Sequence, residues 1–198
     1  MLRKIITYLI TFIMCSAAVM AQDRDNASDR NEKFAIRTSI PSWAAAVINI
    51  AGEYNFHDRW SMGLDLLYSG WDYGRSDRKF RTYQVRPEVR YWLREDRLGI
   101  FADAHLAVIG YNVALPSWKY RIQDHDGKRP ALGGGLGIGY RFKLGHSKHW
   151  RIEANVGFGV YALYYDRYYN NRQGQLFDSH KRVFFGIDNV SLSLVYAP

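Results

Sequence analysis

The residues of this sequence best suited to chemistry are a carboxylate and a histidine two positions apart, Asp103 and His105. In an extended strand these positions share a face, and a carboxylate beside a histidine can work as an acid–base pair. The alternative is an ion-paired interior, because buried charges need partners. Four charged residues occupy equivalent positions in other strand-like segments: Glu53, Arg86, Glu88 and Arg90. With charges of both signs gathered on one face, we predict a structural network of ion pairs rather than a catalytic pair.

A second histidine, His125, lies between Asp124 and Asp126, and the pair Ser179-His180 follows later in the chain. A serine, a histidine and an acid can perform acyl chemistry, but these residues have no spacing that assembles a triad. A metal at Asp124, His125 and Asp126 would need another strong ligand, which the local sequence does not supply. We therefore predict no catalytic residue, no metal ligand and no cofactor, and a protein that is not an enzyme.

The glycine-rich stretch LGGGLGIGY, residues 132–140, has no nucleotide-binding spacing. It fails the G-x-G-x-x-G pattern in every register and lacks the lysine of a phosphate-binding loop. Its glycines alternate with Leu136, Ile138 and Tyr140, which is the two-residue period of a strand. We interpret the stretch as part of a sheet.

Alternation of apolar and polar residues with a period of two recurs along the chain and indicates strands. In the stretch TYQVRPEVRYWL, residues 82–93, every charged side chain falls on one face. Eight such segments are predicted, at about residues 34–40, 47–56, 60–71, 82–93, 98–113, 131–144, 150–165 and 182–196. The last segment changes phase near Asp188 and Asn189, which predicts a β-bulge.

The connections between these segments alternate in length. The short ones are residues 57–59, 94–97 and 145–149, and the longer ones are residues 41–46, 72–79, 115–129 and 166–181. In an up-and-down barrel successive connections fall on opposite rims, so all the short turns would lie at one rim. The pattern predicts an all-β fold, an eight-stranded antiparallel up-and-down transmembrane β-barrel with its long loops outside the cell.

Membrane barrels and soluble barrels both have strands in which apolar and polar residues alternate. The two kinds of barrel differ in which face of the strands points inside. The polar face contains almost no lysine, and its arginines suit buried carboxylate pairs. The glycines Gly133, Gly135, Gly137 and Gly139 also lie on that face, where they would make room for side chains from the opposite wall. Aromatic residues gather toward both strand ends, as at the two interfaces of a bilayer. These features favour an apolar face toward lipid, with a soluble periplasmic, lipocalin-like barrel as the alternative.

The N-terminus has the pattern of a secretory signal peptide: a basic start, an apolar stretch and small residues before a cleavage site, all within residues 1–21. We predict cleavage after Ala21, a flexible polar leader over residues 22–33 and one barrel domain over residues 34–198. The only cysteine, Cys15, falls in the predicted signal peptide, so the mature chain would have no disulfide.

The chain of 198 residues has a formal net charge of +8, and aromatic residues make up 16% of it. A basic chain can bind nucleic acid, but the positive charges of this chain are spread along the sequence rather than clustered. A chain with a secretory signal also rarely meets nucleic acid. Anionic lipid headgroups or surface polysaccharide fit that distribution better, and we predict no nucleic-acid partner.

Three stretches carry a family resemblance: IAGEYNFHDRWSMGLDLLYSGW at residues 50–71, QVRPEVRYWL at residues 84–93 and NVSLSLVYAP at residues 189–198. Together they resemble the domain-of-unknown-function 3575 family of small outer-membrane barrels of Gram-negative bacteria. The resemblance covers about residues 34–198. It implies an eight-stranded barrel of uncharacterised activity and supplies no catalytic residues. Some members are encoded beside fimbrial genes, which implies an accessory role in fimbrial assembly as an alternative function.

Two groups of residues follow from the predicted barrel. We expect nine residues to fill its interior: Glu53, Asp65, Arg86, Glu88, Arg90, Asp103, His105, Arg141 and Glu153. We expect four aromatic residues of the long loops to make surface contacts: Trp118, Tyr120, Tyr168 and Tyr169. Two of these belong to the stretch YYDRYYNN, residues 164–171, whose tyrosines, arginine and asparagines suit contact with protein or carbohydrate.

The predicted function is that of a monomeric scaffold in the cell outer membrane that presents surface loops for binding or adhesion. Its expected partners are the lipid bilayer, the barrel-insertion machinery and a surface protein, fimbrial subunit or glycan. A lipid-modifying outer-membrane enzyme, with a rim histidine and serine in acyl chemistry, is a further alternative.

Overall fold

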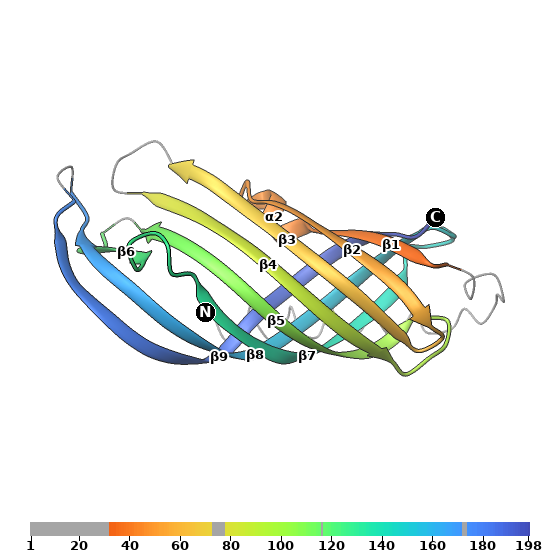
Figure 1. The fold of residues 1–198 in the computed structure, drawn as a ribbon. Coiled ribbons are helices and arrows are strands. Elements are labelled where there is room, and N and C mark those ends of the chain that lie inside the picture. The colour runs from red at the N-terminus through yellow and green to blue at the C-terminus, as the bar shows by residue number, and fades with distance from the viewer. Residues whose placement is uncertain (1–31, 73–77, 116, 172–173) are drawn as a thin grey trace, which may run out of the picture.

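The computed structural model describes residues 32–72, 78–115, 117–171 and 174–198, which form strands and one short helix (Figure 1). The elements in chain order are β1 (Phe34–Ser39), α2 (Ile40–Ala44), β2 (Ile48–His57), β3 (Trp60–Asp72), β4 (Lys79–Trp92), β5 (Gly99–Ala114), β6 (Tyr120–Asp124), β7 (Ala131–Lys143), β8 (Trp150–Tyr169) and β9 (Leu176–Tyr196). No helix of the described ranges is long and apolar enough to cross a membrane. The predicted signal peptide and most of the predicted leader lie outside the described residues.

Eight strands close into a ring by antiparallel pairing. β1 pairs with β2 on one side and with β9 on the other, so the first and last strands join. The ring then runs through β3, β4, β5, β7 and β8. The short strand β6 lies between β5 and β8, as β7 does, but nearer the end of the ring. It pairs with β5 on one side and with residues 165–169 of β8 on the other. The predicted all-β, antiparallel up-and-down fold with eight strands is confirmed, and the crossing of a membrane stays a prediction.

The two ends of the ring differ in their connections. Residues 58–59, 93–98 and 144–149 make tight turns at the end where β1 begins and β9 finishes, which we name the short-turn rim. The connections after β1, β3, β5 and β8 lie at the opposite end, the long-connection rim. This arrangement follows from the even number of strands in the ring, and it matches the alternation of connection lengths in the sequence.

One of the predicted loops is largely strand and another contains a short strand, and there the prediction was wrong. β8 extends to Tyr169 and β9 begins at Leu176, so most of the stretch YYDRYYNN is paired sheet rather than loop. The predicted loop 115–129 contains β6. Tyrosine and arginine side chains are tolerated in strands, and five residues of β6 are too few for a period of two to stand out.

A β-bulge interrupts the pairing of β8 with β9, as predicted. Gly157 lies opposite Asn189 and Phe158 lies opposite Ile187, so Asp188 is the extra residue of β9. A bulge redirects a side chain, and here the Asp188 side chain becomes 4% exposed and reaches His105 inside the ring.

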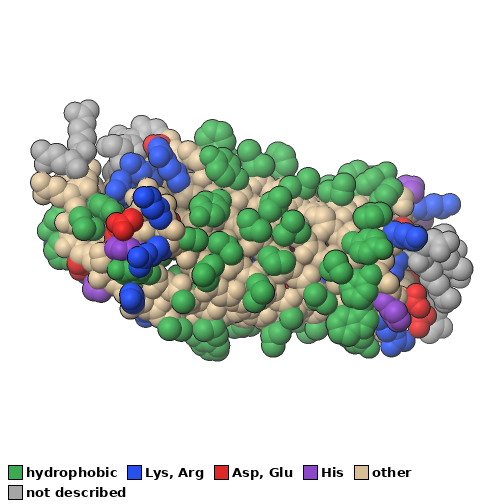
Figure 2. Space-filling view, in the orientation of Figure 1, with side chains coloured by type: hydrophobic (Ala, Val, Ile, Leu, Met, Phe, Trp, Pro, Cys, Tyr) green, Lys and Arg blue, Asp and Glu red, His purple; other side chains and the backbone are tan. Residues whose placement is uncertain are grey.

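The ring places charges inside and apolar side chains outside. Glu53 and Arg141 are 2% and 1% exposed, whereas Leu106 and Phe185 are 67% and 78% exposed. In Figure 2, hydrophobic side chains cover the middle of the visible face, and charged side chains gather at its two ends. Soluble monomers rarely expose an apolar surface of this extent.

Candidate functional site

The interior of the ring holds a dense network of ion pairs. Arg141 Nη2 lies 2.6 Å from a carboxylate oxygen of Glu53 and 2.6 Å from one of Glu153. Arg90 Nη1 lies 3.2 Å from Glu53 and 2.9 Å from Glu153. All four side chains are at most 2% exposed. Glu153 therefore has two arginine partners, and Glu53 has a third in Arg37, whose Nη1 lies 3.4 Å away. These pairs offset part of the cost of removing the charges from water.

The network continues across the ring through Arg37 of β1. Its Nη2 lies 2.6 Å from Asp65 Oδ1 and 2.5 Å from Glu88 Oε1. Glu88 also accepts a hydrogen bond of 2.6 Å from Arg90 Nε. Two rings extend the packing: the Arg90 guanidinium lies 4.6 Å from the Phe101 ring centre, and that of Arg141 lies 4.4 Å from the Trp92 ring centre. Charged side chains and the aromatic rings of Trp92 and Phe101 pack together in this part of the ring interior.

All nine residues predicted for the interior lie inside the ring. Eight are buried, and the Asp65 side chain is 25% exposed. The predicted set omitted Arg37, Arg151 and Asp188, whose side chains are also buried, although the two arginines fall on the predicted polar face. Arg37 shares its face with the buried Ala35 and Ser39, so the alternation of β1 was a usable signal. Asp188 depends on the bulge, which shifts the phase of β9, and no period-of-two count places such a residue.

The buried histidine His105 is surrounded by hydrogen-bond partners. His105 Nδ1 lies 3.0 Å from Asp103 Oδ1, and His105 Nε2 lies 2.6 Å from Asp188 Oδ2. Tyr161 donates a hydrogen bond of 2.7 Å to the same Asp188 oxygen, and Asn155 donates one of 2.7 Å to Asp103. The His105 side chain is fully buried. Both ring nitrogens of His105 therefore have carboxylate partners, as expected for a buried network of polar side chains.

The glycines of β7 make room for side chains, but not for those of the opposite wall. A Cβ on Gly137 would lie 2.2 Å from Asp103 Oδ2, and one on Gly139 would lie 2.2 Å from Phe101. Asp103 and Phe101 are the direct cross-strand partners on β5. The expected reason for these glycines was therefore wrong: they admit neighbouring side chains that lean across the strand.

We expect Gly135→Ala to destabilise the protein by about 1–3 kcal/mol, the range for overpacking of a filled interior. The new Cβ would lie 2.1 Å from the carbonyl oxygen of Phe158, and backbone cannot rotate away as a side chain can. Gly52→Ala is the matched control, since no atom lies within 4 Å of its Cβ position. Denaturant unfolding of the purified protein measures both, and equal stabilities of the two variants would contradict the packing assigned to β7.

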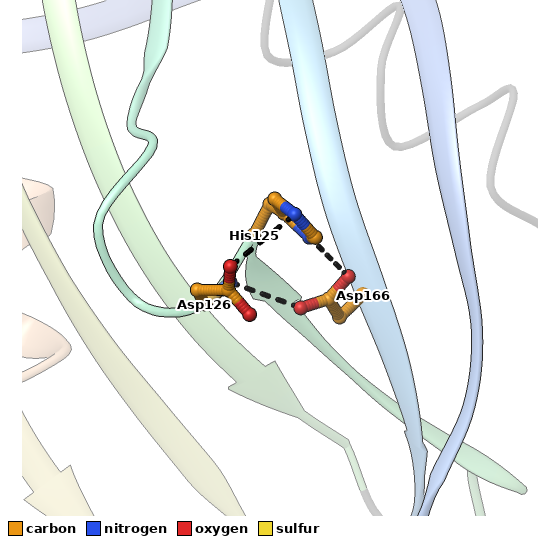
Figure 3. A group of neighbouring side chains, drawn as sticks. All are labelled: His125, Asp126 and Asp166. Atoms are coloured by element: carbon orange, nitrogen blue, oxygen red, sulfur yellow. Dashed lines mark hydrogen bonds and ion pairs between the residues drawn. The ribbon is translucent and has the colours of Figure 1, made fainter.

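A second polar group lies at the long-connection rim (Figure 3). His125 and Asp126 follow β6, and Asp166 comes from β8, where it is 1% exposed. His125 Nδ1 lies 2.7 Å from Asp166 Oδ1, and the backbone N–H of Asp126 donates a hydrogen bond of 3.0 Å to Asp166 Oδ2. Ser179 of β9 donates a hydrogen bond of 2.6 Å to Asp166 Oδ1. Asp166 thus ties the turn after β6 to β8 and β9.

This group does not have the order of a nucleophilic triad. In a triad the histidine lies between the nucleophile and the acid. Here Asp166 lies between Ser179 and His125, while His180 contacts Arg167 and Asp178 instead. The histidine therefore cannot take a proton from the serine in this arrangement.

Asp166 is the acid that the local sequence around His125 could not reveal. The ligand atoms of His125, Asp126 and Asp166 lie within 4.8 Å of one another, a spacing that a divalent cation could occupy. Asp124 is not part of this group, although it precedes His125 in sequence. Because Asp166 already accepts hydrogen bonds from Ser179 and the Asp126 backbone, the cluster is complete as a structural clamp.

The clamp has a defined pH dependence. Burial raises the pKa of Asp166, but hydrogen bonds from Ser179, the Asp126 backbone and His125 outweigh burial and hold the pKa below the ordinary value of 3.8. The contribution to stability is therefore complete above pH 3.8 and is lost as the pH falls through the lower pKa of the folded state. Asp166→Asn removes the charge at every pH.

We expect Asp166→Asn to lower the hydrogen-exchange protection of the Asp126 amide about tenfold or more at pH 7, because hydrogen bonds to charged groups contribute roughly 1.5–3 kcal/mol. Asp178→Asn, at a partly buried ion pair of the same rim that does not involve Asp126, should leave that amide unchanged. Unchanged protection in both variants would contradict the role of Asp166 as the clamp.

The four aromatic residues predicted as loop contacts fall mainly on strands. Tyr120 begins β6, and Tyr168 and Tyr169 end β8, while Trp118 lies just before β6 and is 42% exposed. The Tyr120 ring centre lies 5.6 Å from that of Tyr169 and 4.7 Å from that of Phe177. Strand extensions thus hold these aromatic side chains in fixed positions at the rim.

Comparison with known proteins gives one match. A search of curated proteins and a search of solved structures each returned no match to this chain. The sequence model of a family described as "Protein of unknown function (DUF3575)" matches residues 7–197, which is nearly the whole chain. The resemblance of the three quoted stretches is confirmed by this match, and the chain belongs to the DUF3575 family of proteins of unknown function.

Proposed function

We propose that this protein spans the outer membrane as a sealed barrel and presents its long-connection rim outside the cell as a binding surface. The observation that carries the proposal is the inverted distribution of polarity. Leucine, valine and phenylalanine side chains surround the outside of the ring, and arginine–carboxylate pairs fill the inside. Membrane barrels have this distribution, whereas soluble barrels bury the apolar face.

The paired side chains inside the ring support a scaffold rather than a channel. Eight-stranded barrels have an interior just wide enough for side chains. Here Arg90, Arg141, Glu53 and Glu153 meet in the middle, together with the buried Trp92. An ion entering the ring would have to displace these pairs, so the activity of the protein belongs at its rim.

The rim supports binding because aromatic and arginine side chains lie on its paired strands β6 and β8. Arg121 lies 4.6 Å from the Tyr168 ring centre, and Arg167 lies 5.2 Å from that of Tyr120. Aromatic and arginine side chains are enriched at protein interfaces. Their placement on β6 and β8 lowers the entropy that binding would cost relative to a flexible loop.

Single cysteines test the orientation, because Cys15 is the only natural cysteine. Lys128→Cys places a thiol near the long-connection rim, and Lys148→Cys places one in a turn of the short-turn rim; both positions are exposed. We expect a membrane-impermeant maleimide to label Lys128→Cys in intact cells, and Lys148→Cys only after the outer membrane is permeabilised. Labelling of both only after permeabilisation would contradict the surface location of the long-connection rim.

A further inference from the structure

A groove on the outside of the ring combines an apolar floor with cations. It has a volume of about 410 Å³ and lies where β7 begins beside β8 and β9. Its floor is formed by Leu132, Ala162 and Val183, which lie side by side in register. Leu132 and Val183 are 56% and 68% exposed, so these side chains face the surroundings of the ring. We name this groove the charged groove.

Tyr164 lines one end of the charged groove and gathers cations around its ring. The Arg129 guanidinium lies 5.1 Å from the Tyr164 ring centre, and Lys181 Nζ lies 5.0 Å from it. Within the described part of the chain, neither cation has a carboxylate at ion-pairing distance. Two like charges beside one ring repel each other, so an anion that bridges them would be bound favourably.

The neighbouring acids of the same rim are engaged elsewhere. Asp166 is held by Ser179 and His125, and Asp178 is paired with Arg167. The carboxylate of Asp126 lies 3.3 Å from His125 Nε2. His125 in turn stacks on Tyr164 with ring centres 3.8 Å apart. Lys181 lines the groove itself, and Arg129 lies beside the Tyr164 ring that lines it, so both positive charges are close to the groove.

The depth of Tyr164 matches a bilayer interface. On β8 the outward positions run from Trp150 at the short-turn rim to Tyr164. At ~3.3 Å per residue and a tilt of about 40°, residues 150–164 span roughly 35 Å, close to the ~30 Å of a hydrocarbon core. The floor of the charged groove would lie among acyl chains, and Arg129 and Lys181 would lie among headgroups.

A second groove on the outside of the ring differs from the charged groove in having no cations. The larger groove has a volume of about 890 Å³ and includes Gly52, Pro87 and Ala104 in its lining. None of its lining residues is a lysine or an arginine. A hydrocarbon chain could fill either groove, but only the charged groove offers a counter-charge for a headgroup.

We propose that the charged groove binds one phosphorylated membrane lipid. Its phosphate would lie between Arg129 and Lys181, and one acyl chain would lie against Leu132, Ala162 and Val183. The inference rests on the proposed membrane location and adds the chemical class of a ligand. A phosphate would supply the negatively charged partner that the two cations do not have among the described residues. The acyl chain would cover apolar surface at the same time.

Lipid binding can be measured on the purified full-length protein in a neutral detergent by native mass spectrometry. The probe is bis-phosphorylated lipid A, compared with its chemically dephosphorylated form and with inorganic phosphate. We expect one saturable lipid per chain and about thirtyfold weaker binding of the dephosphorylated form, since two headgroup cations contribute ~2 kcal/mol. We expect inorganic phosphate to bind far more weakly, because it lacks the chain that occupies the groove.

Variants separate the two parts of the site. The double variant Arg129→Gln, Lys181→Gln should weaken lipid A binding about thirtyfold, and Lys148→Gln in the short-turn rim is its control. Ala162→Phe should fill the charged groove and weaken binding of the lipid, whereas Ala104→Phe in the larger groove should not. Each variant is compared only after its folding has been verified by the mobility of the unheated protein in a denaturing gel.

Equal affinity for the phosphorylated and dephosphorylated lipid on the unaltered protein would overturn the inference, as would an unchanged affinity of the folded double variant. Binding of inorganic phosphate as tight as that of the lipid would reduce the site to a simple anion site and would also overturn it. The proposed function fails separately, if the protein is absent from the outer-membrane fraction. Presence in that fraction without phosphate-dependent lipid binding would contradict the lipid site alone.

Discussion

Arg141→Met is expected to destabilise the protein by about 3–5 kcal/mol, which is the cost of leaving buried charges without their partner. Arg141 Nη2 lies 2.6 Å from both Glu53 and Glu153, and all three side chains are 1% exposed. Methionine preserves much of the volume beside Trp92 but supplies no charge. Glu153 would keep only Arg90 of its two arginine partners, and Glu53 would keep Arg90 and the more distant Arg37. We therefore expect one of the glutamates to take up a proton or the ring to open.

Two further variants make this result specific. Arg94→Met removes an arginine of the short-turn rim whose side chain is 64% exposed, and exposed ion pairs contribute about 0–1 kcal/mol. The double variant Arg141→Met, Glu153→Gln removes one charge of each sign and should recover part of the lost stability. Urea unfolding of the protein in lipid vesicles measures all three. A loss for Arg141→Met no larger than that for Arg94→Met would show that the interior network is solvated.

Leu106→Arg is expected to cost about 2–4 kcal/mol in a bilayer, the penalty for a cation at the lipid-facing midplane of a barrel. Leu106 lies near the middle of β5, and its side chain is 67% exposed on the outside of the ring. At a site exposed to water the same substitution would change stability by less than about 0.5 kcal/mol. The size of the effect therefore reports what surrounds the ring.

Ala107→Ser is the matched variant, because Ala107 is the next residue of β5 and is 2% exposed on the inside of the ring. A hydroxyl there joins an interior that already contains His105 and Tyr161, so we expect a small effect. Refolding into vesicles followed by urea unfolding measures both variants. Equal effects of Leu106→Arg and Ala107→Ser would contradict the assignment of the two faces.

The alternation of residue types was sufficient to predict the ring. Strand positions such as residues 83–93 repeat with a period of two for long enough to fix both the element and its faces. It could not predict the rim. β6 has only five residues, and the extension of β8 to Tyr169 is stabilised by β6, which lies far from it in sequence. Pairing between distant short segments leaves no local signal.

The interior charges were predictable from the sequence, because they occupy alternate positions of each strand and so share one face. The rim clamp was not, since Asp166 and His125 are 41 positions apart and meet only through the pairing of β6 with β8. Asp188 required knowledge of where its bulge would turn the chain. The glycines of β7 were assigned to the interior correctly, but the side chains that they admit depend on the register with β5.

The central claim, a closed ring in the outer membrane, is tested most directly by one experiment on the unaltered protein. Outer-membrane, inner-membrane and soluble fractions are separated, and each is run on a denaturing gel with and without prior heating. We expect the protein in the outer-membrane fraction, where it should migrate faster unheated than heated, because a closed ring of eight paired strands resists detergent until it is heated. A protein in the soluble periplasmic fraction whose mobility does not change with heating would contradict the account.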